Sequence, residues 1–302
     1  MRLYRYFSIA LLFGTLTYAR QPVFAQEWLQ VREGKLFGIS GIASIETRED
    51  TASFLVVHDN KGDDRIRLAI VSLSATDSIE YLPLAWPEDW ELPIDLESLT
   101  MVPQTDRPDP CFMAASSSGR VFYFSFDAAE VSIEPIAVFE LPDVPSGSNL
   151  EGFALQEIAG RLLAVWADRG SGERAAIVYW GELDLAALTV NAPEAIAVRV
   201  PWPEGNVRHI SDLKVDDRGG LTITSAMDSG DDGPFDSAVY HAGTFAVDGE
   251  AIAFEAASEL RPVARYDGRK IEAIELLTAP VGGTILGTDD ENFGSSIVRF
   301  VQ

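Results

Sequence analysis

The stretch Lys270-Ile271-Glu272-Ala273-Ile274-Glu275-Leu276-Leu277 decides how this chain is read, because it recurs in altered form four times upstream. Each copy has an aliphatic residue, then Glu or Ser, then a short residue and another apolar residue, and each opens a run typical of a β-strand. The shared polar positions are Ser40, Glu97, Glu151, Ser211 and Glu272. They lie 57, 54, 60 and 61 residues apart. This period is typical of propeller blades, so the sequence predicts five.

Each repeat contains strand-like segments separated by turn residues, and helical periodicity is nearly absent. We therefore predict an all-β fold, a five-bladed β-propeller with four antiparallel strands per blade. The fifth repeat lacks an outer strand before the chain stops. Residues 27–32 form an unassigned strand, and we expect them to pair with residues 297–301 in the last blade and close the ring. Residues 26–302 are expected to be one domain, since no Pro/Ser-rich linker divides them.

The first 25 residues have the pattern of a secretory signal peptide. Arg2 and Arg5 precede an apolar run over residues 7–16, and Ala25 is a small residue before the expected cleavage point. No later stretch is long and apolar enough to span a bilayer, so no membrane segment is expected. The sequence predicts export, to a periplasmic or extracellular location.

The composition excludes some partners. The formal net charge of -24 disfavours nucleic acid and anionic membranes, and it favours cations, neutral sugars or basic partners. Cys111 is the only cysteine, so no internal disulfide is possible, and we interpret it as a buried small apolar residue. We expect a monomer.

The five shared polar positions are expected to form one ring, because the first strand of each propeller blade lines the axis. Three carboxylates on one axis repel, so their pKa values must rise or a cation must lie among them. Calcium takes about six to eight oxygen ligands, which three Glu and two Ser side chains could supply together with waters. Magnesium prefers near-octahedral, water-rich coordination, so it fits this set of residues less well. The ring therefore predicts a bound calcium ion held by Ser40, Glu97, Glu151, Ser211 and Glu272. The alternative is that these Glu side chains bind only water and backbone amides.

The order Ser, Glu, Glu, Ser, Glu around five blades resembles the fold of the soluble calcium-activated nucleotidases (apyrases). It is also similar to the uncharacterised bacterial propeller families labelled phytase-like or esterase-like, through Ser-Gly-Ile-Ala (40–43), Asp-Leu-Glu-Ser (95–98) and Asn-Leu-Glu-Gly (149–152). This resemblance implies that the five ring residues are calcium ligands. The phosphate-binding stretch of the nucleotidases has only partial matches, at Asp63-Asp64-Arg65-Ile66 and at Ala167-Asp168-Arg169-Gly170. Nucleotidase activity is therefore not carried over.

The mouth of the channel is expected to gather the remaining polar residues, because the loops between second and third strands emerge there. The expected rim residues are Asp59, Asn60, Asp95, Asn149, Asp168, Arg208, Asp228, Asp289 and Asp290. The catalytic candidates are His58, His209, Lys270 and Arg169, with a His as general base and the cations orienting an anionic group. The same residues are also compatible with a binding module, or with solvated turns that have no function.

The sequence thus favours an exported propeller with a chiefly structural calcium ion and a rim that binds a small polar ligand. The alternative is a calcium-dependent phosphoester hydrolase of nucleotidase or phytase type. The acidic loop 228–236 adds a second, weaker calcium candidate at Asp228, Asp231 and Asp236.

Overall fold

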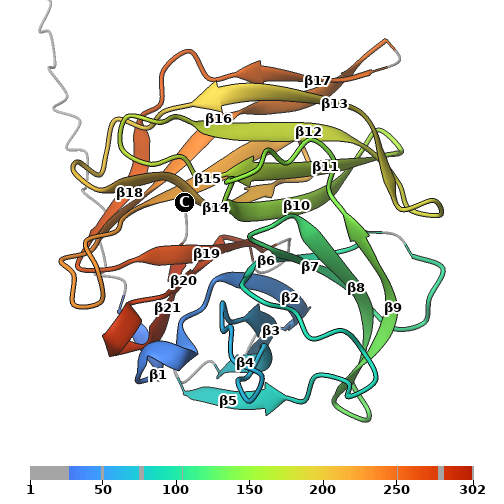
Figure 1. The fold of residues 1–302 in the computed structure, drawn as a ribbon, viewed down its shortest axis with the longest axis vertical. Coiled ribbons are helices and arrows are strands. Elements are labelled where there is room, and N and C mark those ends of the chain that lie inside the picture. Colours follow the sequence, from blue (N-terminus) through green and yellow to red (C-terminus); the bar gives the residue numbers. More distant parts are fainter. Residues whose placement is uncertain are drawn as a thin grey trace, which may run out of the picture.

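A computed structural model describes residues 27–48, 51–74, 78–103, 105–249, 251–277 and 282–300. These residues form five small antiparallel sheets arranged around one axis (Figure 1). The predicted five-bladed all-β propeller is therefore confirmed. The predicted signal peptide lies outside the described residues. No helix in the described part of the chain is long and apolar enough to cross a membrane.

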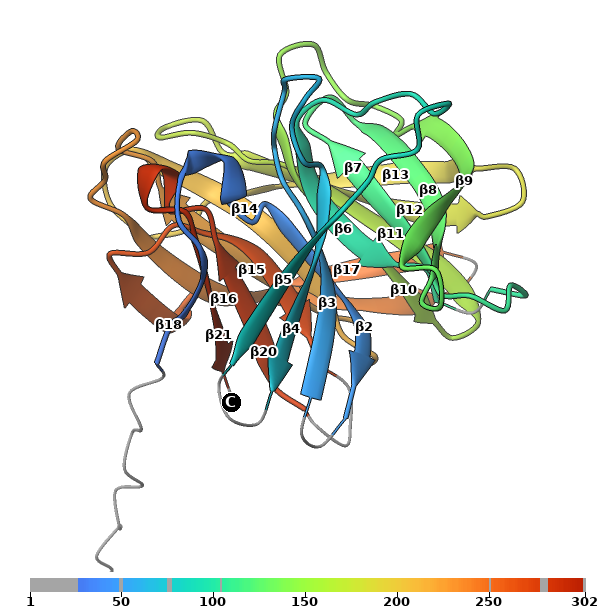
Figure 2. The same ribbon diagram turned by 90° about the horizontal axis from the view of Figure 1, so that it is seen from below.

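The first three blades are regular four-stranded sheets whose strands follow chain order from the axis outwards. Blade 1 contains β2 (Gly41–Thr47), β3 (Thr51–Val57), β4 (Leu68–Ser74) and β5 (Ile79–Leu84). Blade 2 contains β6 (Leu96–Met101), β7 (Cys111–Ser116), β8 (Arg120–Asp127) and β9 (Ser132–Glu140). Blade 3 contains β10 (Leu150–Ile158), β11 (Arg161–Asp168), β12 (Ala176–Asp184) and β13 (Thr189–Val198). Figure 2 shows β2 to β5 running between two loop-bearing faces of the molecule.

Blade 4 has a fifth strand. It contains β14 (Val207–Val215), β15 (Gly220–Met227), β16 (Asp236–Asp248), β17 (Ala251–Ala256) and β18 (Pro262–Asp267). The 13-residue strand β16 is long enough to take two partners on its outer edge. Its first half pairs with β18 and its second half with β17. Residues 260–266, which the sequence predicts as a possible extension of the fourth repeat, overlap β18 and so belong to the same sheet.

Blade 5 joins the two ends of the described chain. It contains β19 (Ile271–Leu276), β20 (Thr284–Thr288), β21 (Ser295–Phe300) and β1 (Leu29–Arg32). Strand β1 pairs antiparallel with β21, and Leu29 lies opposite Ile297. Val31 of β1 is buried. The predicted closure of the ring is confirmed.

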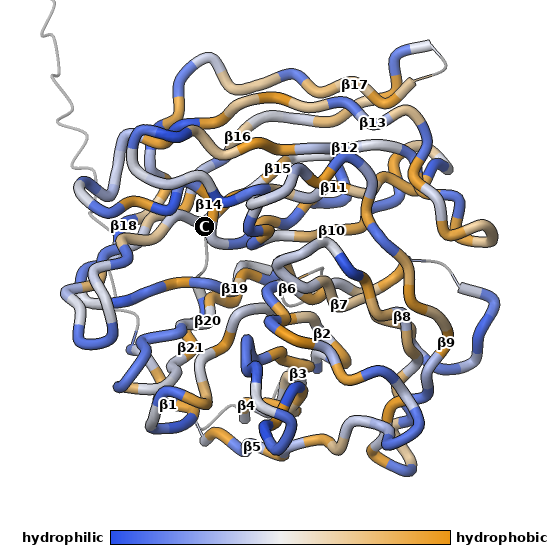
Figure 3. The backbone as a smooth tube through the Cα atoms, viewed as in Figure 1, coloured by the Kyte–Doolittle hydropathy of each residue, from blue (hydrophilic) through white to orange (hydrophobic). Residues whose placement is uncertain are grey.

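The hydrophobic core lies between blades. In the described residues, five clusters of buried apolar side chains each join two neighbouring sheets around the ring. Alternation along the strands explains this, because successive side chains of a strand point to opposite faces of its sheet. In Figure 3 apolar stretches follow the strands, while many connecting loops are hydrophilic.

The inner strands β2, β6, β10, β14 and β19 surround the axis and contact one another in sequence. The strand pairing is irregular at the ring glutamates of blades 2, 3 and 5. The register shifts between Leu96 and Ser98, between Leu150 and Gly152, and between Ile271 and Ala273. In each case the skipped residue is the ring glutamate. A β-bulge of this kind re-aims a side chain, and here it turns the three glutamates towards the axis.

The inner strands touch directly beyond the ring position. A Cβ on Gly41 would lie 2.7 Å from the backbone nitrogen of Leu99, and one on Gly152 would lie 2.8 Å from Cγ of Leu213. Only glycine allows so close an approach of neighbouring strands. The axis is thereby divided into two ends, an acidic cluster on the ring side and a separate pocket on the opposite side.

Candidate active site

Arg208 is the centre of the acidic cluster. Its Nη1 lies 2.5 Å from Oε1 of Glu272 and 3.6 Å from Oε1 of Glu151, and its Nη2 lies 2.6 Å from Oδ2 of Asp228. One guanidinium group therefore joins ring glutamates of blades 3 and 5 from its position in blade 4. Although burial lowers the pKa of Arg208, the three carboxylates raise it above its ordinary value.

Lys270 supplies a second buried cation. Its Nζ lies 3.2 Å from Oε1 of Glu272, 2.5 Å from Oε1 of Glu291 and 3.7 Å from Oδ2 of Asp289. Burial lowers its pKa, but Glu272 and Asp289 raise it further, so the net shift is upwards. Glu272 is thus held between two cations.

Glu151 is held by Arg169, whose Nη1 lies 3.0 Å from Oε1, and by Nδ2 of Asn149 at 3.2 Å. Burial raises the pKa of Glu151 more than the arginines lower it. Its Oε2 and the hydroxyl of Ser40 are buried and have no hydrogen-bond partner among the described residues. Ser211, by contrast, donates to the carbonyl of Ile271 at 2.7 Å.

Glu97 is the ring glutamate without a partner. Its side chain makes no hydrogen bond or ion pair with any residue that the structure describes, and only 7% of the residue is exposed. Burial raises its pKa well above the ordinary value, and the charges of Glu151, Asp95 and Glu272 add to this effect. Glu97 is therefore a buried, unpartnered carboxyl group whose surroundings disfavour the charged form.

Asp59 follows strand β3 and lies within electrostatic range of Glu97, whose pKa its charge helps to raise. Burial, then the charges of Glu272 and Asp95, raise its pKa from 3.8 to about 6. Asp59 is partly exposed and makes no hydrogen bond to a described residue. It is a carboxylate near the mouth that ionises close to neutral pH.

Asp95 lies two residues before Glu97 and is fixed by its neighbours. Its Oδ2 accepts a hydrogen bond from the Ser117 hydroxyl at 2.7 Å, and its Oδ1 lies 3.0 Å from Nζ of Lys61. The Lys61 side chain is largely exposed, so this ion pair covers the mouth without sealing it.

The two predicted histidine bases are buried and their rings are engaged. His58 Nδ1 lies 2.5 Å from the Gly38 carbonyl and its Nε2 lies 3.0 Å from the Tyr81 hydroxyl. Burial lowers the pKa of His58 to about 4. His209 accepts a hydrogen bond from the Val200 N–H at Nδ1 and contacts the Gly172 carbonyl through Nε2. This geometry favours a structural role for both rings.

Several expected rim residues hold loops in place. Asn60 donates to the carbonyls of Leu36 and Ile66. Asp168 pairs with Arg174 at 2.5 Å, and Asp290 pairs with Arg269 at 2.7 Å.

Asp289 is buried against Gly38, and a Cβ added to Gly38 would lie 2.1 Å from Oδ1 of Asp289. Of the expected rim, Asp59 and Asp95 together with Arg208 and Asp228 belong to the cluster at the mouth.

The cluster carries its own cations, and this is where the calcium interpretation departs from the structure. Among the described residues no group of three His, Cys, Asp or Glu is arranged to hold a metal ion. Arg208 and Lys270 bind Glu151 and Glu272 directly. Protein side chains therefore offset the negative charge for which the sequence predicted a metal ion.

The second candidate calcium site has a similar outcome. Two of its three acids are paired with different cations of the protein, Asp228 with Arg208 and Asp231 with Lys35.

Sequence reasoning placed Lys61 in a rim loop but missed Glu291. Glu291 lies in a 3-10 segment between β20 and β21, and the repeat register gave no signal for it. Arg208 and Lys270 were expected at the rim, but not as the partners of the ring glutamates.

Comparison with known proteins places the fold. No protein-family model matches the chain, and no curated protein matches its sequence. Solved structures do match. A thermostable family-43 glycoside hydrolase is 12% identical with a TM-score of 0.54, and the match covers 88% of this chain and 91% of that one. An endo-arabinase from Bacteroides thetaiotaomicron is 9% identical with a TM-score of 0.52, covering 91% and 98%.

A third match is an α-L-arabinofuranosidase from Podospora anserina, solved with cellotriose, which is 10% identical with a TM-score of 0.51 and covers 92% and 97%. At these identities the likeness concerns the fold. The resemblance to calcium-activated nucleotidases and to phytase-like or esterase-like propellers is wrong, since the matching propellers are glycoside hydrolases. The two functions predicted from the sequence, a chiefly structural calcium-binding propeller and a calcium-dependent phosphoester hydrolase, are therefore wrong as well. Calcium as an additional bound ion stays a prediction, which metal analysis of the purified protein tests.

Proposed function

We propose that this protein hydrolyses glycosidic bonds at the acidic cluster, with Glu97 as general acid and Asp59 as general base. The observation that carries the proposal is the pair itself. Two carboxyl groups of one cluster have different environments, because Glu97 is buried with its pKa raised well above the ordinary value, whereas Asp59 is partly exposed with a pKa of about 6. Such a division of pKa values between two carboxyls is what acid and base roles require.

The chemistry follows from the two protonation states. Protonated Glu97 gives its proton to the oxygen of the departing sugar as the glycosidic bond breaks. Ionised Asp59 takes a proton from the water whose oxygen forms the new bond to the anomeric carbon. Arg208 and Lys270 hold Glu151 and Glu272 in place, and the charges of these two glutamates help to raise the pKa of Glu97.

The substrate class follows from charge. A cluster rich in carboxylates, in a chain of net charge -24, repels polyanionic glycans and favours neutral ones. Two of the matching propellers are named as an endo-arabinase and an α-L-arabinofuranosidase, and the third is named as a family-43 glycoside hydrolase. We propose a neutral glycan substrate, a monomeric enzyme, and export through the predicted signal peptide.

The test is release of reducing sugar from a panel of neutral polysaccharides, with polygalacturonate as the charged comparison. Glu97→Gln should lower the rate on polysaccharide roughly 10²- to 10⁴-fold. An aryl glycoside with a good leaving group needs no proton donor, so the same variant should keep most of its activity on that substrate. The exposed Glu88→Gln is the matched control and should behave as wild type.

The pH profile gives an independent readout. Because the base must be ionised, the rate should fall below about pH 6 as Asp59 takes up its proton. No turnover of any neutral glycan in the panel, or full activity of Glu97→Gln on polysaccharide, would overturn the proposal. The configuration of the first product shows whether water attacks directly or through a covalent intermediate.

A further inference from the structure

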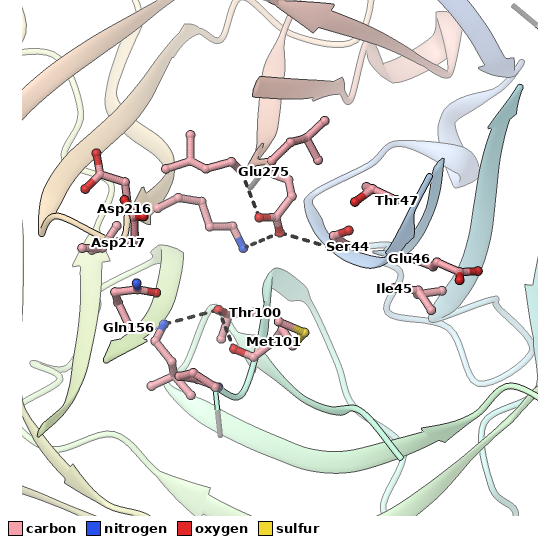
Figure 4. Close-up of a pocket in the computed structure, with 16 residues that line it drawn as sticks. Ser44, Ile45, Glu46, Thr47, Thr100, Met101, Gln156, Asp216, Asp217 and Glu275 are labelled. Carbon is pink, nitrogen blue, oxygen red and sulfur yellow. Dashed lines mark hydrogen bonds and ion pairs between the residues drawn. The ribbon is translucent and has the colours of Figure 1, made fainter. Parts of the chain in front are cut away.

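A second pocket lies at the opposite end of the propeller axis from the acidic cluster. It has a volume of about 440 Å³, and residues of all five inner strands line it (Figure 4). We call it the basal pocket and define it by Ser44, Thr47, Met101, Gln156, Lys214 and Glu275. Small-molecule sites typically have volumes of about 300–1,000 Å³, so the basal pocket is of ligand size.

A buried ion pair forms the floor of the basal pocket. Lys214 is 5% exposed, and its Nζ donates to the Leu99 carbonyl at 2.5 Å and lies 3.7 Å from Oε2 of Glu275. Glu275 accepts the backbone N–H of Ser44 at 3.3 Å and that of Leu276 at 2.9 Å. An ammonium group has three donors and a carboxylate has about four acceptor positions. The pair therefore keeps hydrogen-bonding capacity of both kinds, side by side.

The walls combine uncommitted polar groups with apolar ones. The Gln156 amide and the Thr47 hydroxyl make no hydrogen bond to any residue that the structure describes, and both are only partly exposed. Ile45, Met101 and Leu155 contribute the apolar part of the lining. Specific ligand sites typically have this composition, in which a few polar groups fix orientation over an apolar surface.

Charge selects among ligands. Glu46, Asp216 and Asp217 line the opening and repel anions, while the Lys214 ammonium at the floor opposes a bare cation. A neutral molecule with adjacent hydroxyl groups satisfies both floor residues, since one hydroxyl accepts from Lys214 and the next donates to Glu275. The apolar side chains suit the C–H faces of a sugar ring.

We propose that the basal pocket is a non-catalytic binding site for a neutral mono- or disaccharide. The closely touching inner strands at Gly41 and Gly152 separate it from the acidic cluster, so it does not rest on the proposed hydrolase activity. Binding at one end and turnover at the other are measured separately, and either can fail alone.

The methionines provide a reporter for each end. Met101 lines the basal pocket and is 45% exposed. Met227 ends β15 on the ring side, next to Asp228, and Met113 is fully buried. In protein carrying ¹³C-methyl methionine, titration with D-xylose, L-arabinose, D-galactose and xylobiose should move the Met101 signal and leave Met113 unchanged. Glu97→Gln serves as the background for the titration, so that disaccharides are not consumed.

Gln156→Leu is the test variant, because Gln156 makes no internal hydrogen bond whose loss would unfold the protein. Loss of one ligand hydrogen bond should weaken sugar binding roughly 3- to 10-fold. Hydrolysis by the same variant, made in the wild-type background, should be unchanged. The matched control is Gln30→Leu in blade 5, which should bind sugar as the parent does.

Three outcomes would overturn the proposal. In the first, none of the four sugars moves the Met101 signal at about 50 mM, a concentration at which even a very weak site would be occupied. In the second, sugar moves Met227 alone, which places binding at the acidic cluster. In the third, putrescine moves Met101 and no neutral sugar does, which makes the pocket a site for organic cations.

Discussion

Replacing Asp59 with Asn should make this protein more stable above pH 6 and inactive at the same time. The environment of Asp59 raises its pKa from 3.8 to about 6, so keeping it ionised in the folded protein costs free energy. Each pKa unit corresponds to about 1.4 kcal/mol. Because Asp59 keeps some contact with water, we expect a gain of about 2–3 kcal/mol for Asp59→Asn at pH 8.

The sign of the effect fixes its pH dependence. A raised folded-state pKa means that the folded protein binds the proton more tightly than the unfolded chain does. Wild type and Asp59→Asn should therefore have similar stability below pH 4. The difference should grow between pH 4 and pH 6 and stay constant above that, as wild type loses stability through the folded pKa of Asp59.

The assay is urea unfolding of both proteins at pH 4, 6 and 8, together with melting temperatures. At pH 8 the gain corresponds to an increase of roughly 4–12 °C for a domain of this size. The control is Asp106→Asn, which changes an exposed carboxylate outside the cluster and should show no pH-dependent gain. Equal stability of Asp59→Asn and wild type at pH 8 would refute the reasoning that this carboxylate is held at a cost.

Three further predictions concern the scaffold. Deleting residues 27–32 leaves β21 without its outer partner and removes buried Val31, so the unfolding free energy should fall by at least about 3 kcal/mol; an unchanged urea midpoint would contradict the closure. Arg208→Gln removes a largely buried cation that pairs with two ring glutamates, so it should lower the unfolding free energy by about 3–5 kcal/mol at pH 7, measured by urea unfolding. Gly41→Ala forces two inner strands apart and should lower the unfolding free energy by at least about 2 kcal/mol, measured by urea unfolding. Gly62→Ala, whose Cβ meets only the side chains of Arg65 and Asp64, should change it by no more than about 0.5 kcal/mol in the same assay.

The repeat predicted the fold well because its polar position carries a structural requirement in every blade. Glu97, Glu151 and Glu272 stand where the pairing of the inner strand is interrupted, so the spacing of these residues reports the spacing of the blades. The closure of the ring was also readable, because β21 ended the sequence without an outer partner. The two-partner edge of β16 was predicted only in part, since residues 260–266 were interpreted as a possible extension of the fourth repeat.

The candidate site was predicted in its location and not in its chemistry. The sequence placed three glutamates on the axis, but it did not show which cations would meet them. Arg208 reaches Glu272 across 64 residues of chain, and such a contact depends on the angle between blades and on side-chain length. The two histidines were chosen for their intrinsic pKa, and burial against backbone carbonyls removes that property.

The pairing of β1 with β21 also sets the order in which the molecule is completed. The first strand of the described chain pairs with the last one, so the propeller cannot close before residues 295–300 have been synthesised. Until then, blade 5 lacks both its outer strands and the hydrophobic cluster that it shares with blade 1 stays open. Closure of the ring is therefore a late step in folding, even though one of its two strands is among the first residues to be made.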